Sequence, residues 1–415
     1  MPNITTLKCT TCAKEYQPEE LDYTCPICGP MRGTLEVLYD YDQLTKDLTK
    51  ASLQQNHDFT HWRYLPLLPI IKKEYIQPLS LGWTPIYKTQ DLAARLGMKN
   101  LWIKDDGRNP SASYKDRASS VAVVKTLEKK APTITAASTG NAASSLAAFT
   151  AVAGLPTVIF VPQDAPKAKI TQLLLFGAKV LRVQGSYDDA FDLCCTAAEK
   201  WGWYNRSTAI NPYLGEGKKT GAFEICEQLQ WQVPDYVFVA VGDGCIYQSL
   251  WKGFKEFHQI GLIDRVPKLI GVQAEGASPL VRAFVAGRDT AEPVQTDTFA
   301  DSIAVGVPRD QVKALKAVRE SNGRFIAVDD DEIKKAIALL AGKAGVLAEP
   351  AGATGMAGLM KMAQMSEIKS DESAVVLVTG NGLKDIDGVM QASEQQSVLV
   401  ENDIADVAMK FKRLP

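Results

Sequence analysis

An alternation of short apolar runs with helical segments, between residues 101 and 378, constrains the fold of this 415-residue chain more than any other feature. The apolar runs are typical of buried strands, and we expect strands at Leu101–Lys104, Thr133–Ala136, Thr157–Val161, Lys179–Val183, Tyr236–Ala240, Lys268–Gln273, Phe325–Val328 and Ala374–Val378. The intervening segments have helical periodicity, and we expect helices at Asp116–Lys129, Ala142–Val152, Ala165–Phe176, Tyr187–Trp201, Thr220–Gln230, Ser249–Ile260 and Asp330–Ala341. This alternation predicts an α/β protein with open, mostly parallel sheets and helices on both faces.

The length of the chain suggests about two to three domains. A segment rich in glycine, asparagine and proline, Asn205–Gly217, is the predicted crossing between two sheet-containing lobes. We therefore expect a small head at residues 1–40, a large domain formed by residues 41–104 and 206–415, and a small domain at residues 105–205. Ligands are expected in the cleft between the lobes, at the carboxyl ends of the strands.

Composition and charge exclude several classes of protein. Hydrophobic residues make up 46% of the chain, which is enough for a packed core and excludes a mainly disordered chain. The net charge of −2 argues against a nucleic-acid-binding surface over the whole molecule. No apolar run reaches about 18 residues, and the N-terminus lacks the apolar stretch of a signal peptide. We expect a cytoplasmic protein with neither nucleic acid nor membrane as a partner.

Four of the eight cysteines form the pattern C-x2-C-x12-C-x2-C near the N-terminus, at Cys9, Cys12, Cys25 and Cys28. Each C-x2-C pair directs two thiolates to one point, and four thiolates are ligands that structural zinc prefers. We therefore predict a zinc-ribbon-like head. Two disulfides or free thiols are the alternative, and a cytosolic location argues against disulfides. A head that folds without metal is a further alternative.

A lysine stands at the predicted start of a helix in the segment 109–117, which reads NPSASYKDR. Small and hydroxyl residues, among them Ser111 and Ser113, precede Lys115. The positive end of the helix dipole should lower the pKa of this lysine, which suits a Schiff-base amine. A solvated surface lysine is the alternative interpretation.

Three further segments follow predicted strands. Ser138, Thr139, Gly140 and Asn141 precede a helix, where hydroxyls and free N–H groups bind carboxylates or phosphates; an ordinary N-cap by one of the side chains is the alternative. The run Gly242, Asp243, Gly244, Cys245 and Ile246 allows the backbone to close on a phosphate, but common turns share this pattern. Thr379 offers a hydroxyl that can contact a buried ring nitrogen, unless the segment is only a turn.

Taken in order, the segments NPSASYKDR, STGN, the glycine loop and TGNGLKD resemble those of pyridoxal-phosphate enzymes of fold type II. Within this group the chain is most similar to the threonine synthases. That likeness depends on the cysteine-rich head followed by Leu35, Glu36 and Val37, on the segment 216–225 (EGKKTGAFEI), and on the segment 378–384 (VTGNGLK). The resemblance covers nearly the whole chain and implies a large cofactor-binding domain.

The resemblance implies a role for each site residue. Lys115 matches the lysine that holds pyridoxal 5'-phosphate as a Schiff base, and Asn141 matches the asparagine at the ring hydroxyl. The segment 242–246 matches the loop around the cofactor phosphate, and Thr379 matches the hydroxyl beside the ring nitrogen. The segment 138–140 matches the loop that takes the substrate carboxylate. The chain departs from the family at Ser111-Ala112, where Thr-Gly is usual, and at Asp243 and Cys245-Ile246 in the phosphate loop.

The implied activity is the conversion of O-phospho-L-homoserine and water to L-threonine and phosphate, in a homodimer. A small anionic amino acid is the expected partner, and its phosphate needs a second anion site, for which the candidates are Ser111, Ser113, Lys167, Lys169 and Arg309. A dehydratase or a synthase acting on O-phosphoserine could use the same residues. A catalytically inactive regulatory relative is the third alternative, and the intact Lys115 argues against it.

Overall fold

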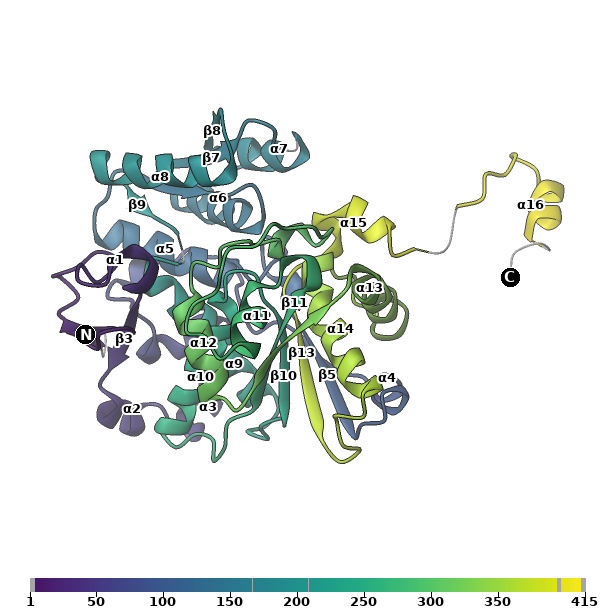
Figure 1. The fold of residues 1–415 in the computed structure, drawn as a ribbon, viewed down its shortest axis with the longest axis horizontal. Coiled ribbons are helices and arrows are strands. Elements are labelled where there is room, and N and C mark those ends of the chain that lie inside the picture. The colour runs from purple at the N-terminus through teal and green to yellow at the C-terminus, as the bar shows by residue number, and fades with distance from the viewer. Residues whose placement is uncertain (1–3, 166, 208, 394–396, 412–415) are drawn as a thin grey trace.

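The computed structural model describes residues 4–165, 167–207, 209–393 and 397–411, and Figure 1 shows their arrangement. The N-terminal head contains a three-stranded antiparallel sheet in the order β2-β1-β3. The strands and short helices of this region are β1 (Ile4–Cys9), β2 (Glu15–Tyr16), α1 (Gly29–Arg32), β3 (Leu35–Tyr39), α2 (Tyr41–Asp47) and α3 (Lys50–Gln54). The head lies at the opposite end of the molecule from the C-terminal helix α16 (Ile404–Phe411), which stands away from the body.

The larger of the two remaining sheets has six strands in the order β12-β11-β10-β13-β5-β4. All neighbours are parallel except β4, which is antiparallel to β5. The strands are β4 (Ile86–Lys88), β5 (Asn100–Asp105), β10 (Tyr236–Ala240), β11 (Lys268–Ala274), β12 (Arg324–Val328) and β13 (Ser373–Val378). Alternate residues of β10 enter two different cores, with Val237 and Val239 on one face and Phe238 on the other. Both faces of this sheet are therefore buried.

The smaller sheet has four parallel strands in the order β8-β7-β6-β9. They are β6 (Ile134–Ala137), β7 (Thr157–Pro162), β8 (Lys179–Val183) and β9 (Tyr204–Asn205). Ile159 and Val161 pack in one core, whereas Val158 and Phe160 face α8 on the other side. Helices cover both faces of this sheet too, which confirms the predicted α/β fold. The predicted domain boundaries remain a prediction.

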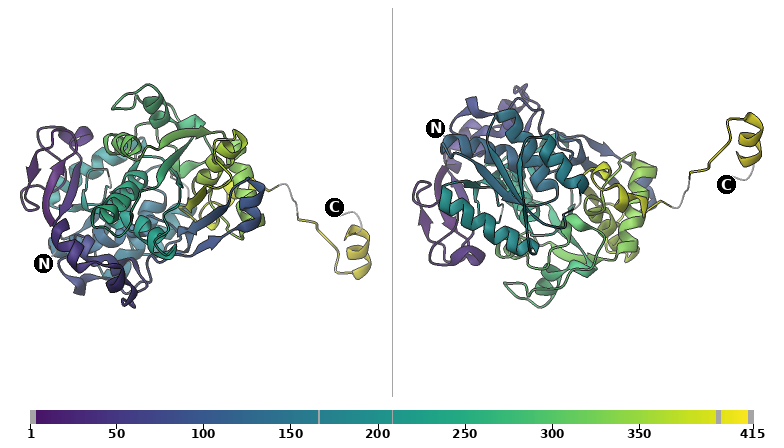
Figure 2. Two further views of the ribbon diagram at one scale, coloured as in Figure 1. Left: turned by 90° about the horizontal axis from the view of Figure 1, so that it is seen from below. Right: turned by 90° about the horizontal axis from the view of Figure 1, so that it is seen from above.

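The α-helices between the strands account for the layers seen in Figures 1 and 2. Their bounds are α4 (Gln90–Arg95), α5 (Asp116–Glu128), α6 (Asn141–Ala153), α7 (Lys167–Leu175), α8 (Tyr187–Trp201), α9 (Tyr213–Gln228), α10 (Cys245–Gln259), α11 (Pro279–Val285), α12 (Gln311–Glu320), α13 (Asp330–Ala344), α14 (Pro350–Gln364) and α15 (Ile386–Met390). Short 3-10 turns lie at η1 (His61–Leu67), η2 (Lys73–Tyr75), η3 (Asp106–Arg108), η4 (Glu275–Ala277), η5 (Asp301–Ile303) and η6 (Gly382–Lys384). No α-helix of the described residues is both long and apolar enough to cross a membrane.

All eight predicted strands are confirmed. The predicted helix Tyr187–Trp201 is confirmed with its bounds as α8, and the other predicted helices are confirmed with shifted ends. The largest shift is in α9, which begins at Tyr213, so the last five residues of the predicted crossing Asn205–Gly217 are helical. Its glycines allow close helix packing instead of making a loop. A Cβ on Gly217 would lie 1.8 Å from the carbonyl oxygen of Arg117 on α5, and one on Gly221 would lie 2.3 Å from the Tyr114 hydroxyl.

The helix α14 was not predicted from the sequence. It is buried on nearly all sides and consists largely of small residues, so it lacks an amphipathic period. Gly355 of α14 faces Phe238, where an added Cβ would lie 3.3 Å from the carbonyl oxygen of the strand. This close packing places the N-terminus of α14, and Glu349 before it, beside the end of β13.

Candidate active site

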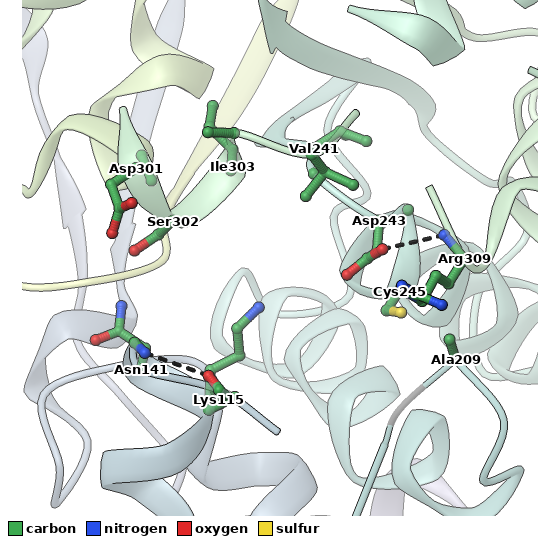
Figure 3. A pocket seen from close by; sticks show the side chains of 18 of the residues that line it. Lys115, Asn141, Ala209, Val241, Asp243, Cys245, Asp301, Ser302, Ile303 and Arg309 are labelled. Atoms are coloured by element: carbon green, nitrogen blue, oxygen red, sulfur yellow. Dashed lines mark hydrogen bonds between the residues drawn. The ribbon is translucent and has the colours of Figure 1, made fainter. Parts of the chain in front are cut away.

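A cavity of about 850 Å³ lies where the carboxyl ends of strands from both sheets meet. Its wall contains parts of all four segments that the sequence pointed to, and Figure 3 shows Lys115, Asn141, Asp243 and Cys245 around the cavity. The four are Lys115, the segment 138–141 after β6, the segment 242–246 after β10, and Thr379 after β13. The segment 294–307, which connects α11 to α12 and includes η5, completes the wall.

Lys115 is the N-cap residue of α5 and lines the cavity. Its position is fixed by the neighbouring loop, because the Tyr114 N–H donates to the Thr379 carbonyl at 2.8 Å and the Asn381 N–H donates to the Ala112 carbonyl at 3.0 Å. Burial lowers the pKa of Lys115 from its usual value, and the positive charge of Arg206 lowers it further. The predicted direction of the shift is therefore confirmed, with burial as its main cause. The alternative of a solvated surface lysine is wrong.

The segment before α6 carries no ordinary side-chain N-cap. The N-cap position belongs to Gly140, and within the described residues no side chain caps this end. The Ser138 hydroxyl instead accepts a hydrogen bond from the Gly140 N–H at 3.2 Å. Asn141 begins the helix, and its side-chain amide donates to Glu349 Oε1 at 2.7 Å. The start of α6 is consequently open toward the cavity, as an anion site requires.

The glycine loop turns directly into α10, which begins at Cys245 rather than at the predicted Ser249. Gly244 has a φ of +92°, and an added Cβ would lie 2.6 Å from the Cβ of Ala314. Only glycine fits such a turn without movement of its neighbours. The backbone N–H groups of the loop and the positive end of α10 could hold a phosphate, as helix N-termini do in general. Burial raises the pKa of the Cys245 thiol, so Cys245 stays neutral there.

A carboxylate beside a phosphate is repulsive, so the direction of the Asp243 side chain matters for the glycine loop. In the structure its Oδ1 accepts a hydrogen bond from the backbone N–H of Arg309 at 3.0 Å (Figure 3). The backbone N–H of Asp310 in turn donates to the carbonyl of Asp243 at 3.2 Å. The first bond directs the carboxylate toward the segment before α12, and the second holds the loop backbone, so Asp243 anchors the loop.

The structure places Ser111 and Ser113 outside the cavity wall. The Ser111 hydroxyl bonds the Asp116 carboxylate, and the Ser111 N–H donates to Asp116 Oδ2 at 2.6 Å. The Ser113 hydroxyl is fully buried and has no hydrogen-bond partner among the described residues. Both serines therefore belong to the loop that holds Lys115, and neither reaches the space where a ligand would bind.

Two ion pairs cross the mouth of the cavity. Arg309 pairs with Asp188 of α8, and its guanidinium lies 3.9 Å from the centre of the Phe191 ring. Lys169 of α7 pairs with Asp301 of η5. Each pair joins the smaller sheet's helices to the segment around 301–309. Neither Lys167 nor Lys169 lines the cavity.

Five charged residues of the cavity wall were not identified from the sequence, namely Asp188, Arg206, Lys218, Asp301 and Glu349. Glu349 is 3% exposed, and burial raises its pKa to about 7. It precedes Pro350, and a proline in the first turn is a signal for a helix start that could have revealed it. Lys218 lies inside the segment 216–225, but its neighbour Lys219 carries the same sequence signal.

The four cysteines of the head converge. Their sulfur atoms all lie within 4.8 Å of one another, and Cys12 Sγ is 3.7 Å from Cys25 Sγ. Tetrahedral zinc with sulfur ligands at about 2.3 Å requires sulfur atoms about 3.8 Å apart, so this arrangement fits zinc. All eight cysteines are free, and the alternative of two disulfides in the head is wrong.

Lys115 and a glycine-rich loop at a helix N-terminus line one cavity of an α/β fold, an arrangement that suits an enzyme with a phosphate-bearing cofactor. Residues 78–380 match the model of the family described as pyridoxal-phosphate dependent enzymes. Solved structures with this fold include tomato threonine deaminase isoform 2, with a TM-score of 0.65 and 23% identity over 79% of this chain and 90% of that one. Maize serine racemase has a TM-score of 0.64 and 20% identity over 80% of this chain and 92% of that one.

Curated relatives give a narrower result. A threonine synthase of Methanocaldococcus jannaschii is 41% identical over 409 residues, which is 98% of this chain and 99% of the relative. A threonine synthase of Methanosarcina acetivorans is 39% identical, over 95% of this chain and 96% of the relative. The chain therefore belongs to the threonine synthase family of pyridoxal-phosphate dependent enzymes.

Proposed function

We propose that this protein is a threonine synthase that converts O-phospho-L-homoserine and water to L-threonine and phosphate, with its cofactor held on Lys115. The observation that carries this proposal is the position of Lys115. The residue lies in the wall of the cavity, in the same wall as the phosphate loop 242–246. The near full-length similarity to threonine synthases supports the choice of substrate.

The residues present fit pyridoxal 5'-phosphate. Lys115 would hold it covalently, the N–H groups of the loop 242–246 would bind its phosphate, and the Thr379 hydroxyl would meet its ring nitrogen. Asn141 uses one of its two amide N–H groups on Glu349 and keeps the second for the ring hydroxyl. When bound, this cofactor supplies an electron sink that stabilises negative charge at the substrate's Cα.

The side chains divide the remaining work. The Lys115 amine has a lowered pKa, so a larger share of it is unprotonated and able to take the proton from Cα. Thr379 is neutral and cannot hold a proton on the ring nitrogen as a carboxylate would, which favours elimination and replacement over transamination. The open start of α6 at 138–140 would orient the substrate carboxylate through its N–H groups.

Three further properties belong to the proposal. Zinc bound by Cys9, Cys12, Cys25 and Cys28 would stabilise the head, which is a closed and structural type of site. A homodimer follows from family likeness. A cytoplasmic location is in keeping with eight free cysteines, since disulfides are rare in a reducing compartment.

The test is a substrate screen with purified enzyme loaded with cofactor. We expect equal amounts of threonine and phosphate from O-phospho-L-homoserine, and no release from the variant Lys115→Ala. Release of ammonia from serine or threonine at a higher kcat/KM, with no threonine formed, would instead identify a dehydratase. A wild-type protein that binds no cofactor and turns over none of these compounds would contradict the proposal.

A further inference from the structure

Glu349 differs from the other acidic residues of the cavity wall because it has no cation partner. The described acids of the wall are Asp188, Asp243, Asp301 and Glu349. Asp188 and Asp301 each form an ion pair, and Asp243 accepts a backbone N–H. Glu349 forms no ion pair with any residue that the structure describes, although it is 3% exposed. Burial of an unpaired carboxyl costs free energy, which points to a function for this residue.

The side chain of Glu349 does not cap the helix that it precedes. The residue is the N-cap of α14, and its carboxyl bonds none of the described N–H groups of that helix. It reaches instead to α6, where the Asn141 side-chain amide donates to Glu349 Oε1 at 2.7 Å. The two residues are 208 positions apart in the chain, and both line the cavity. The bond therefore belongs to the site and not to the local structure of α14.

The backbone at Glu349 is held in register with the segment that carries the cofactor lysine. One isolated antiparallel bridge joins the residue before Glu349 to Asn381, and another joins Gly380 to Ser113, two positions before the lysine. The Glu349 N–H also donates to the Gly380 carbonyl at 3.1 Å. The carboxyl is therefore attached to a backbone whose place relative to the lysine is fixed.

Gly380 leaves the space that this carboxyl occupies. A Cβ added at Gly380 would lie 2.0 Å from Glu349 Oε1, the oxygen that bonds Asn141. A carboxyl can rotate away from such a contact, but it would then leave Asn141. A Cβ added at Gly352, in the first turn of α14, would lie 2.7 Å from the Gly380 carbonyl oxygen. Two glycines thus keep the carboxyl and the amide in contact.

Glu349 can accept this hydrogen bond in its neutral form. Burial raises its pKa to about 7. Neighbouring groups change that pKa less, and they are Asn141, Lys384 and Lys115, which lower it, and Asp385, which raises it. A protonated carboxyl still has a carbonyl oxygen that accepts the amide N–H. It does so without placing a second negative charge near an ionised oxygen of the cofactor ring.

We propose that Glu349 is a positioning residue that holds the Asn141 amide with its second N–H toward the ring hydroxyl of the cofactor. This inference rests on the proposed function, which places Asn141 at that hydroxyl. An amide can present either an N–H or its carbonyl oxygen to a ligand, and the acceptor at Glu349 selects the N–H. An N–H donated to the ring oxygen stabilises the ionised form of that oxygen. The ionised form absorbs at a longer wavelength than the neutral hydroxyl.

The test records the absorbance of enzyme loaded with pyridoxal 5'-phosphate. It compares Glu349→Leu with Glu349→Gln, which keeps an acceptor oxygen, and the exposed substitution Glu199→Gln is the control. In Glu349→Leu the ratio of the long-wavelength form to the short-wavelength form should fall about tenfold, the effect of one hydrogen bond to a charged oxygen. Glu349→Gln should keep most of the wild-type ratio, and the control should keep all of it. A wild-type ratio in Glu349→Leu would overturn the inference, even if its melting temperature were lower.

A second measurement shows whether Glu349 acts through Asn141. Asn141→Ala alone should lower the ratio of the two forms as Glu349→Leu does. Adding Glu349→Leu to Asn141→Ala should then change the ratio little, because the two residues act as a unit. A further fall of full size in the double variant would show that Glu349 affects the cofactor by another route, and the inference would be wrong.

Folding and the proposed function are controlled separately. Thermal unfolding shows whether each variant folds, and Glu349→Met replaces a leucine variant that does not. If the ratio changes as expected in an enzyme that forms no threonine from O-phospho-L-homoserine, the proposed function fails and the positioning role stands. If threonine forms and the ratio in Glu349→Leu is unchanged, the positioning role fails and the proposed function stands.

Discussion

Two neighbouring lysines on α9, Lys218 and Lys219, are almost equally buried but have opposite surroundings. Lys219 is 0% exposed, pairs with Glu216 at 2.5 Å and Glu256 at 2.6 Å, and lies over the Tyr39 ring. Lys218 is 1% exposed, pairs with no described carboxylate, and lines the cavity. Burial alone therefore does not separate structural charges from functional ones. The presence or absence of a partner within the chain does.

The same distinction holds for the rest of the molecule. Arg117 of α5 bonds Asp106 at 2.7 Å and Glu224 of α9 at 2.5 Å, and Lys104 bonds Glu224 at 2.7 Å, all fully buried. His61 lies against this cluster, and burial lowers its pKa to about 3, so it stays neutral. The charges of Arg117, Lys104, Asp106 and Glu224 thus have partners within the cluster, which joins α5 to α9. The Lys115 amine and the four cysteine thiols, like Lys218, have no such carboxylate or cation partner among the described residues.

The largest expected effect is on stability, and it contrasts the two lysines directly. Lys219→Met should cost about 3–5 kcal/mol of unfolding free energy, because it leaves the two buried carboxylates of Glu216 and Glu256 to share the single cation of Lys252. Lys218→Met should change that free energy by less than about 1 kcal/mol, since no internal pair is lost. Denaturant unfolding of the apoproteins measures both. Equal losses in the two variants would contradict the distinction between paired and unpaired buried charge.

Next in size is a pH effect at Glu349. This acid accepts a hydrogen bond from the side-chain amide of Asn141 and lies near the charges of Lys384, Lys115 and Asp385. Burial raises its pKa from 4.5 to about 7, so the folded protein keeps a proton that the unfolded chain releases. Its contribution to stability is therefore present below pH 4.5 and is lost as the pH rises toward 7. At about 1.4 kcal/mol per unit, the loss is about 3 kcal/mol.

Glu349→Gln should remove this dependence. Relative to the variant, the wild type should lose about 3 kcal/mol of unfolding free energy between pH 4.5 and pH 8. Denaturant unfolding of the apoproteins at several pH values gives the difference, and the exposed substitution Glu199→Gln is the control. Parallel pH profiles for wild type and Glu349→Gln would show that Glu349 is ionised in the folded state.

The smallest effect on catalysis is expected at the head. Cys12→Ser should lose about one equivalent of zinc and lower the melting temperature by a few degrees, while kcat stays within about twofold of wild type. The head region contacts α9 through Tyr39 and α10 through Tyr41. No described residue of the head lines the cavity, so the loss of zinc should leave the site unchanged. Metal analysis checks the claim, with Cys195→Ser as control. A wild-type protein with no bound zinc would contradict it.

Much of this fold could be predicted from the sequence, because buried parallel strands are continuous apolar runs. The segment with Lys115 was found for a related reason, since it follows such a strand. Short elements gave no comparable signal: β9 has two residues, and β4 is a three-residue edge strand. In α9, Gly215 and Gly217 contributed to the predicted crossing, although the structure has both in the helix and uses Gly217 for a close contact with α5.

The sequence predicted which segments form the candidate site, but not which charged side chains have ion-pair partners within the protein. Lys218 and Lys219 are adjacent and chemically identical, so their roles depend on which face of α9 meets the cavity. That face is set by contacts with α5 and α10, far away in sequence, such as Gly253 of α10 against the Lys219 carbonyl. The sequence also could not show that the anion candidates Lys169 and Arg309 are already paired. The tertiary structure shows that Lys169 pairs with Asp301 and Arg309 pairs with Asp188.

The central claim is that Lys115, and not Lys218 of the same cavity wall, carries the cofactor. Borohydride reduction of enzyme loaded with pyridoxal 5'-phosphate converts a lysine–cofactor imine to a stable amine, and peptide mass spectrometry then locates it. We predict that the modification lies on Lys115 and that the peptide containing Lys218 is unmodified. Modification of Lys218, or of neither lysine in a protein that retains bound cofactor, would contradict the account.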